Sequence, residues 1–241
     1  MGSSVAVVDS WAELRGPIGP LYVAWGPAGV TLVERAGDAA GFELDASLRT
    51  GRPVTRMERV PDRLASQIQR QLGGVYQPDL PLDFRGLTWF AGAALRKTME
   101  IPWGEVRPYS WVAREIGRPL AVRAVGSTMA RNPLPFVVPC HRVVRADGHI
   151  GEYGAGGPAA KRAMLATEGV DADALDRLAG SGVRFLGDDA TDLCCYPTCH
   201  RAQAIPADRL VRFRSGEDAL LAGYRGCPDC RPVDRAVFRD R

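Results

Sequence analysis

Hydrophobic positions in the first eighty residues follow two periods, one typical of a small sheet and one typical of a helix. Short β-type runs cover 21–25 and 30–33, and the glycines and proline at 26–29 between them predict a hairpin turn. Over 62–72 apolar residues recur every four positions, which predicts an amphipathic helix. The prolines near 78–81 then indicate a connection between two lobes.

The middle of the chain is predicted to be helical. Over 87–99 the apolar residues form the i, i+3, i+4, i+7 stripe of a helix packed on one face. A short helix over 110–116, a break at Gly117 and a second helix from Pro119 to about residue 130 favour a helix-turn-helix. Because small residues line the second helix, it can approach another backbone closely, and that partner is either protein or DNA.

Composition narrows the class of protein. The 241 residues are 46% hydrophobic, 24% charged and 7% aromatic, which is typical of a globular protein and excludes a disordered or fibrous one. No apolar stretch approaches the roughly 18 residues of a membrane helix, and the first residues lack the basic start of an export signal. We therefore expect a cytoplasmic protein that does not bind membranes.

The local distribution of charge says more about a binding partner than the net charge does. The net charge of +3 excludes a bulk polycation, yet seven arginines lie between Arg107 and Arg145 against the single acid Glu115. This segment is a basic island, and it overlaps the expected helix pair.

One cysteine lies apart from the others in a segment with reactive character. The run NPLPFVVPCHRV places Cys140 after an expected buried strand, between prolines, and directly before His141 and Arg142. A cysteine attacks as its thiolate, and its ordinary pKa of about 8.5 means that it needs a base or a nearby positive charge. The two following side chains offer both, so a reactive thiol is favoured over an inert core cysteine.

The segments PCHRV, GEVRPYSWVA, RAVGSTMARNPLP and GEYGAGG resemble the O6-alkylguanine-DNA alkyltransferase (methylated-DNA–protein-cysteine methyltransferase) family over 15–169, most densely from residue 87. This resemblance implies an α/β N-terminal lobe over 1–80 and a mainly helical, helix-turn-helix alkyltransferase domain over 81–170. It also implies DNA repair by direct, irreversible, single-turnover transfer of the alkyl group from O6-alkylguanine to Cys140, without a cofactor. O4-alkylthymine is a second candidate substrate.

The same resemblance implies the catalytic residues. Cys140 is the alkyl acceptor, His141 takes the thiol proton through a water, and Glu168 orients and charges that imidazole. Tyr109 helps to rotate the target nucleotide and donates a proton toward guanine N3. Asn132 ties the turn before the reactive cysteine to the helix pair.

The resemblance also implies DNA-binding residues, and their roles agree with the need to extrude the damaged base, because a duplex hides its O6 substituent. Arg123 is implied as the finger that fills the vacated stack. The Val143 carbonyl would accept from the exocyclic amine of guanine, and Tyr153 belongs to the loop that borders the site. Arg107 and Arg131 are candidate phosphate contacts, although Arg131 is equally well explained as a solvated surface charge.

The loop 151–157 departs from the family because it is one residue longer than in the best-known members. Its glycines leave the size of the accepted alkyl group open. The insertion also shifts the spacing between Cys140 and Glu168 by one residue.

Five of the six cysteines lie in the last fifth of the chain, in a C-x3-C and a C-x2-C arrangement. In a cytoplasmic protein this spacing favours zinc over disulfides, with Cys195, Cys199, Cys227 and Cys230 as the four ligands. The cluster resembles the zinc-binding, methylphosphotriester-repair domain of the Ada adaptive-response protein. We expect that domain over 183–234, after a linker or loosely helical spacer over 171–182.

Two interpretations of the zinc site stay open. In Ada-type domains the cysteine matching Cys195 both ligates zinc and accepts a methyl group from a phosphotriester. The alternative is a closed zinc knuckle that only folds a segment too short for a core of its own. Cys194 is expected to be a spare cysteine, and His200 is a minor candidate ligand.

The leading prediction is thus a suicide DNA-repair alkyltransferase with an appended zinc module, acting as a monomer on double-stranded alkylated DNA. The alternative is an alkylation-damage-binding or transcription-regulating protein in which neither cysteine transfers a group. A cysteine hydrolase is disfavoured because His141 is adjacent to Cys140, whereas hydrolase dyads join residues distant in sequence.

Overall fold

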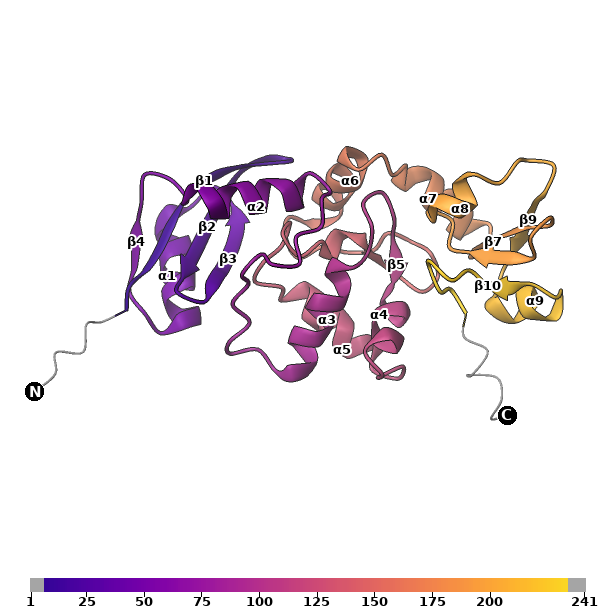
Figure 1. Cartoon of the computed structure of the whole chain (residues 1–241), viewed down its shortest axis with the longest axis horizontal. Helices are drawn as coiled ribbons and strands as arrows, with labels where there is room; N and C mark the ends of the chain where they lie inside the picture. Colours follow the sequence, from indigo (N-terminus) through magenta and orange to yellow (C-terminus); the bar gives the residue numbers. More distant parts are fainter. Residues whose placement is uncertain (1–6, 234–241) are drawn as a thin grey trace, which may run out of the picture.

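Three parts follow one another along the long axis of the molecule in chain order (Figure 1). The computed structural model describes residues 7–233. An N-terminal lobe is followed by a mainly helical middle lobe and then by a small C-terminal domain, the arrangement expected from the sequence. None of the helices described is long and apolar enough to cross a membrane.

The N-terminal lobe is a four-stranded sheet with one helix on each face. Its strands, in the spatial order β3-β2-β1-β4, are β1 (Asp9–Gly16), β2 (Gly19–Gly26), β3 (Gly29–Arg35) and β4 (Val54–Arg56). Side chains alternate between the faces, so Trp11 and Tyr22 pack under α1 (Ala39–Thr50) while Ala12 and Leu21 face the main core. The predicted hairpin at 26–29 is confirmed, whereas β1 and α1 were not predicted.

Helix α2 (Asp62–Leu72) covers the main-core face of the sheet and connects it to the middle lobe. Its bounds match the predicted helix. The buried side chain of Gln71 donates to the Val137 carbonyl (3.2 Å) and accepts from the Gln77 N–H (2.8 Å). One amide thus fastens the N-terminal lobe to the segment that leads into Cys140.

Short helices build the middle lobe around a shared apolar core. They are α3 (Trp89–Met99), α4 (Tyr109–Glu115), α5 (Val122–Ala130), the 3-10 turn η1 (Cys140–Arg142) and α6 (Gly157–Thr167). A two-stranded parallel ladder pairs β5 (Arg107–Pro108) with β6 (Val143–Val144). The helix pair α4–α5 turns at Gly117, whose positive φ of 70° suits glycine.

Two sequence-based expectations in this lobe were wrong. The second helix of the pair begins at Val122 rather than at Pro119, because residues 118–121 form a turn closed by the Ala121 N–H on the Arg118 carbonyl. The segment before Cys140 is buried but is not a strand. Its three prolines cannot donate to a ladder, and only an isolated bridge between Pro135 and Val138 forms.

An ordered helix lies where the spacer was expected before the C-terminal domain, and it packs on the middle lobe. Helix α7 (Ala172–Gly180) is capped by the Asp171 carboxylate, which accepts from the Ala174 N–H (2.8 Å). A sheet of order β10-β8-β7-β9 follows, with two short helices. These elements are β7 (Phe185–Asp188), β8 (Leu193–Cys195), α8 (His200–Gln203), β9 (Leu210–Phe213), α9 (Gly216–Leu221) and β10 (Arg225–Gly226).

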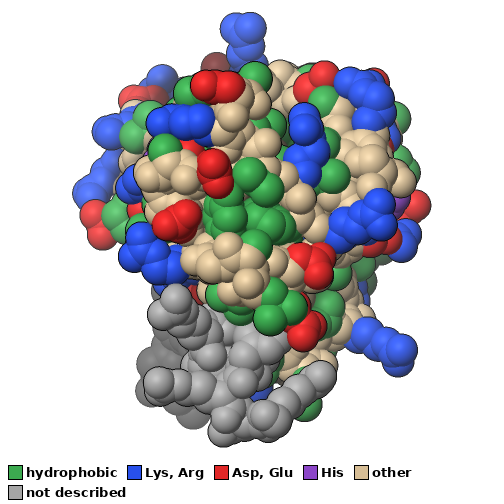
Figure 2. Space-filling model, turned by 90° about the vertical axis from the view of Figure 1, so that its right-hand side faces the viewer, with side chains coloured by type: hydrophobic (Ala, Val, Ile, Leu, Met, Phe, Trp, Pro, Cys, Tyr) green, Lys and Arg blue, Asp and Glu red, His purple; other side chains and the backbone are tan. Residues whose placement is uncertain are grey.

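The outer end of the molecule, formed by this domain, carries charges of both signs. Figure 2 shows basic and acidic side chains interspersed around a central group of hydrophobic ones. The visible part of this end therefore presents no uniform positive face.

The contact made by Gln71 yields a stability prediction. Replacing Gln71 with Leu leaves the buried Val137 carbonyl and Gln77 N–H without their partner, so the free energy of unfolding should fall by about 1–3 kcal/mol. Urea unfolding measures this change. The matched control Gln67→Leu, on the same helix, should change stability by less than about 0.5 kcal/mol; equal effects of the two variants would contradict the assignment.

Candidate active site and metal centre

Cys140 begins the turn η1 and is held by one amide. Its side chain is buried, and its Sγ accepts a hydrogen bond from Asn132 Nδ2 (3.1 Å). The same Nδ2 donates to the Val138 carbonyl (3.2 Å), and Asn132 Oδ1 accepts from the Leu134 N–H (3.0 Å). Burial raises the pKa of the Cys140 thiol, while the Asn132 hydrogen bond opposes the rise. The thiol is therefore protonated at neutral pH and needs a base to react.

A buried carboxylate organises the two residues that follow Cys140. Glu168 Oε1 lies 2.7 Å from His141 Nε2 and accepts from Arg142 Nη2 (3.0 Å), and its Oε2 accepts from Arg142 Nε (2.9 Å). The Gly104 N–H adds a longer bond to Oε2 (3.3 Å). Burial raises the pKa of Glu168, but the bonds from His141 and Arg142 outweigh it and lower the pKa overall. Glu168 is thus an anion at neutral pH.

The imidazole of His141 is arranged as a neutral base. Burial lowers its pKa, and the bond to Glu168 opposes this only in part. With Nε2 donating to the carboxylate, Nδ1 carries the free lone pair. This Nδ1 is buried and makes no hydrogen bond with the residues that the structure describes. The group can therefore accept a proton on the side away from Glu168.

Two tyrosines border this centre. Tyr109 is the first residue of α4 and is half-buried, and burial raises the pKa of its phenol. Tyr153 is buried and meets the His141 ring edge-on, with ring centroids 6.2 Å apart and an interplanar angle of 85°. Burial also raises the pKa of Tyr153. Both phenols stay protonated at neutral pH and can donate.

Sequence reasoning missed Lys161, a fully buried residue of α6. Its Nζ donates to the carbonyls of Val143 (2.7 Å), Ile150 (2.7 Å) and Glu152 (3.2 Å), which ties β6 to the loop before Tyr153. Burial lowers its pKa to about 8. The sequence did contain a sign of its burial. Residue 161 shares one helix face with residues 164 and 165, which are both apolar.

The basic island divides into inward and outward arginines. Arg123 and Arg131 are exposed on or just after α5, beside the small exposed residues Ala124 and Ser127. Arg107, expected to contact phosphate, is instead only 2% exposed and is paired with Glu105. That expectation was wrong, because the charge is already neutralised under the C-terminal domain.

A cleft of about 770 Å³ opens beside Cys140, between the middle lobe and the N-terminal lobe. Asn132, Pro135 and the loop 154–156 line one side, and Arg35 and Leu48 line the other. The loop passes so close to α5 that a Cβ on Gly154 would lie 2.7 Å from the Ala130 carbonyl oxygen. The close approach requires glycine there.

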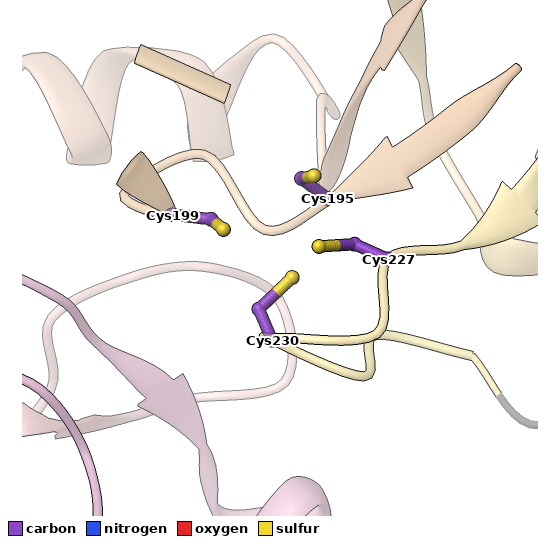
Figure 3. Close-up of side chains that lie close together, drawn as sticks. All are labelled: Cys195, Cys199, Cys227 and Cys230. Atoms are coloured by element: carbon purple, nitrogen blue, oxygen red, sulfur yellow. The ribbon is translucent and has the colours of Figure 1, made fainter. Parts of the chain in front are cut away.

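A second cysteine centre lies in the C-terminal domain. Cys195, Cys199, Cys227 and Cys230 point toward one another from the end of β8, the start of α8 and the segment after β10 (Figure 3). Their sulfurs lie within 4.8 Å of one another, all four side chains are buried, and none forms a disulfide. A tetrahedral ion with metal–sulfur bonds of about 2.3 Å needs sulfurs about 3.8 Å apart, so the four thiols fit a tetrahedral zinc site made of cysteines alone.

The neighbouring candidates lie outside this set. Cys194 packs with Phe213 and Tyr224 in the domain core, and burial raises its pKa to about 12. His200 adjoins Cys199 but turns to Glu105, with its Nδ1 3.3 Å from Oε1. Cys194 therefore stands apart from the four-sulfur cluster, whereas His200 lies within 4.8 Å of the Cys199 sulfur in a second group that includes Glu105.

Two known sequence families match consecutive parts of the chain. Residues 89–170 match the family described as "6-O-methylguanine DNA methyltransferase, DNA binding domain", and residues 176–233 match "Metal binding domain of Ada". A methylated-DNA–protein-cysteine methyltransferase of Methanosarcina barkeri is 32% identical over 144 residues, which are 59% of this chain and 87% of that protein.

The chain belongs to the methylated-DNA–protein-cysteine methyltransferase family.

Other members of the family align over shorter stretches. The mouse protein is 50% identical over 70 residues, 29% of this chain and 33% of its own length. The Mycobacterium tuberculosis protein is 44% identical over 96 residues, 40% of this chain and 57% of its own length. The match thus spans between a third and three fifths of these two relatives.

Solved structures of the family share the fold of the first two lobes. The M. tuberculosis OGT in complex with DNA is 30% identical with a TM-score of 0.53, covering 69% of this chain and 98% of that one. The O6-methylguanine-DNA methyltransferase of Pyrococcus kodakaraensis is 26% identical with a TM-score of 0.53, covering 67% and 99%.

The amide of Asn132 provides a test of how Cys140 is activated. Asn132→Ala removes the donor to Sγ and should raise the pKa of the Cys140 thiol further, because burial then acts unopposed. The pH dependence of iodoacetamide labelling, followed by peptide mass mapping, measures that pKa. The matched control Ser127→Ala, at an exposed residue of α5, should leave the Cys140 profile unchanged; an unshifted Cys140 profile in Asn132→Ala would refute the role of the amide.

Proposed function

We propose that this protein repairs DNA by moving the alkyl group of O6-alkylguanine onto Cys140, once per molecule. The observation that carries the proposal is that buried Cys140 directly precedes buried His141, whose Nε2 is hydrogen-bonded to the Glu168 carboxylate. O4-alkylthymine presents the same kind of alkyl–oxygen bond and is the second candidate substrate. The family relatives support this reaction by their names.

In the proposed reaction the thiol proton of Cys140 passes through a water to His141 Nδ1. The thiolate Sγ then attacks the alkyl carbon, the carbon–O6 bond breaks, and its electron pair leaves with guanine. Tyr109 supplies a proton to the departing base at N3, and the proton on the imidazolium returns to that phenol through solvent. Glu168 stabilises the imidazolium while it lasts. The products are guanine and a thioether on Cys140.

The thioether explains the single turnover. A carbon–sulfur bond to an unactivated alkyl group has no leaving group for water to displace, so the cysteine is not regenerated. Stoichiometric consumption therefore distinguishes this protein from a catalyst that turns over.

Double-stranded DNA is the proposed partner, bound along the exposed face of α5. Small side chains there allow close approach to a groove, and Arg123 projects from this face to fill the gap left by the extruded nucleotide. We propose that Val143 and Tyr153 face the extruded base, with Arg131 at the phosphates. We also propose that the protein acts as a monomer in the cytoplasm.

The cysteine cluster is proposed to hold one zinc ion. Cys195, Cys199, Cys227 and Cys230 would ligate it, and the ion would supply the folding free energy of a domain too small to rely on its own core. The ion would take no part in the bonds that form and break at Cys140. Metal analysis of the purified chain should give one zinc per molecule, and Cys227→Ala should lose it.

Intact-mass spectrometry tests the proposed function. With a duplex containing O6-methylguanine, the protein should gain one methyl group, mapped to the peptide of Cys140 and absent in Cys140→Ala. Binding without any mass gain would instead identify a damage-binding protein and overturn the proposal.

The two exposed arginines should differ in effect. Arg123→Ala removes the side chain that offsets unstacking, so the single-turnover rate on duplex DNA should fall by about 100-fold, equivalent to a few kcal/mol. Arg131→Ala is the matched control and should only weaken DNA binding, to a degree that depends on salt. On a single-stranded substrate, where no stack must be opened, the Arg123→Ala defect should largely disappear; a defect that persists there would exclude the wedge role.

A further inference from the structure

The C-terminal domain is docked on the middle lobe through the segment that precedes Tyr109. Thr198, which lies between two of the four cluster cysteines in sequence, accepts at Oγ1 from the Val106 N–H (2.9 Å). The His200 N–H donates to Glu105 Oε1 (3.1 Å). Both contacts come from the cysteine loop, residues 195–200, which leads into α8. This loop is therefore hydrogen-bonded directly to residues 105 and 106.

Arg107 is buried at the centre of this interface. Its guanidinium pairs with Glu105 and lies 5.8 Å from the ring centroid of Trp111 and 5.6 Å from that of Tyr196. Tyr196 directly follows Cys195, so the arginine is sandwiched between α4 and the cysteine loop. A buried guanidinium held by a carboxylate and two aromatic rings has little freedom to move.

Charged contacts at the edge of α4 extend the interface. Arg114 donates to the backbone carbonyls of Arg231 and Pro232, just after Cys230. The Arg231 side chain returns to Glu115, with 2.9 Å between Nη2 and Oε2. Both halves of the cysteine cluster are therefore anchored to the same short stretch, from Glu105 to Glu115.

This stretch also reaches the reactive centre. Arg107 pairs in register with Val143 in the β5–β6 ladder, and Val143 is three residues after Cys140. Two residues after Arg107 comes Tyr109. A shift of β5 would therefore move both the phenol and the Val143 carbonyl.

We propose that Arg107 is a positioning residue that couples the four-cysteine site to Cys140, so that metal binding in the C-terminal domain sets the rate of alkyl transfer in the middle lobe. The proposal rests on the alkyl-transfer function proposed above. With metal bound, the cysteine loop is fixed and holds β5 through Thr198, Tyr196 and Arg107. Without it, the loop loosens and β5 loses that support. Because such coupling is reciprocal for binding and conformational equilibria, loss of Arg107 should also weaken metal retention.

The first experiment compares the zinc-loaded and chelator-treated full chain in single-turnover assays on O6-methylguanine duplex. For the unaltered protein, zinc removal should lower the maximal rate by about tenfold, within the 5–150-fold range of typical couplings, without a matching loss of DNA affinity. Arg107→Met should be slow with zinc and insensitive to its removal. Arg107→Lys should not restore the rate, because an ammonium lacks the planar face that packs between the rings.

A second readout does not depend on activity. Backbone hydrogen exchange over residues 105–109 should speed up on zinc removal and in Arg107→Met, and zinc should leave the variant faster when a chelator is added. Thr198→Val, which removes the bond from the Val106 N–H and the longer one to the Val106 carbonyl (3.4 Å), should give the same changes to a smaller degree in a chain that still folds. Arg145→Met, at an exposed arginine of the same lobe, is the matched control.

The outcomes separate the two proposals. If the zinc-loaded protein transfers no methyl group, the function fails, while exchange and zinc release still test the coupling. If transfer occurs but neither its rate nor exchange over 105–109 responds to zinc, the coupling is wrong and the C-terminal domain is an independent module.

Discussion

A single buried carboxylate fixes the geometry on which the reactive centre depends. Glu168, at the end of α6, binds the side chains of His141 and Arg142 and the Gly104 N–H. Burying these groups costs solvation free energy, which the complete set of hydrogen bonds offsets only while every partner is present. Because His141 follows Cys140 directly, fixing the imidazole also fixes the turn η1 that carries the thiol, and Asn132 holds the sulfur itself. The irregular segment before the cysteine can therefore be held without a strand.

The two cysteine centres illustrate opposite ways of using a thiol. Cys140 is isolated, receives one amide donor and lies beside a base, so its reactivity is set by proton transfer. The four clustered cysteines lie within 4.8 Å of one another, an arrangement that suits a metal ion. Arg107 lies between the centres, and its burial, like that of Arg142, removes its charge from the exposed part of the basic island.

Much of this organisation was predictable because it is encoded in short segments. The hairpin of the N-terminal lobe, α2 and the four-cysteine cluster follow from local spacing, and the resemblance around PCHRV led to the family. What escaped prediction depends on long-range contacts. The packing of Arg107 against Tyr196 and the bond from Lys161 to the Val143 carbonyl involve residues that are distant in sequence and are brought together by folding. Likewise, the prolines before Cys140 allowed burial but not a strand.

The most direct test of the account is the pH dependence of single-turnover methyl transfer by the unaltered protein and by Glu168→Gln. Since burial lowers the pKa of His141, the unaltered rate should be level near neutral pH and fall about tenfold per pH unit only below that pKa, which lies under 6.5. Glu168 raises the pKa of His141, so the variant should show its acid limb at lower pH. Its plateau should fall by about 100-fold, because the imidazolium loses its counter-ion. An unchanged plateau and acid limb in Glu168→Gln would contradict the account.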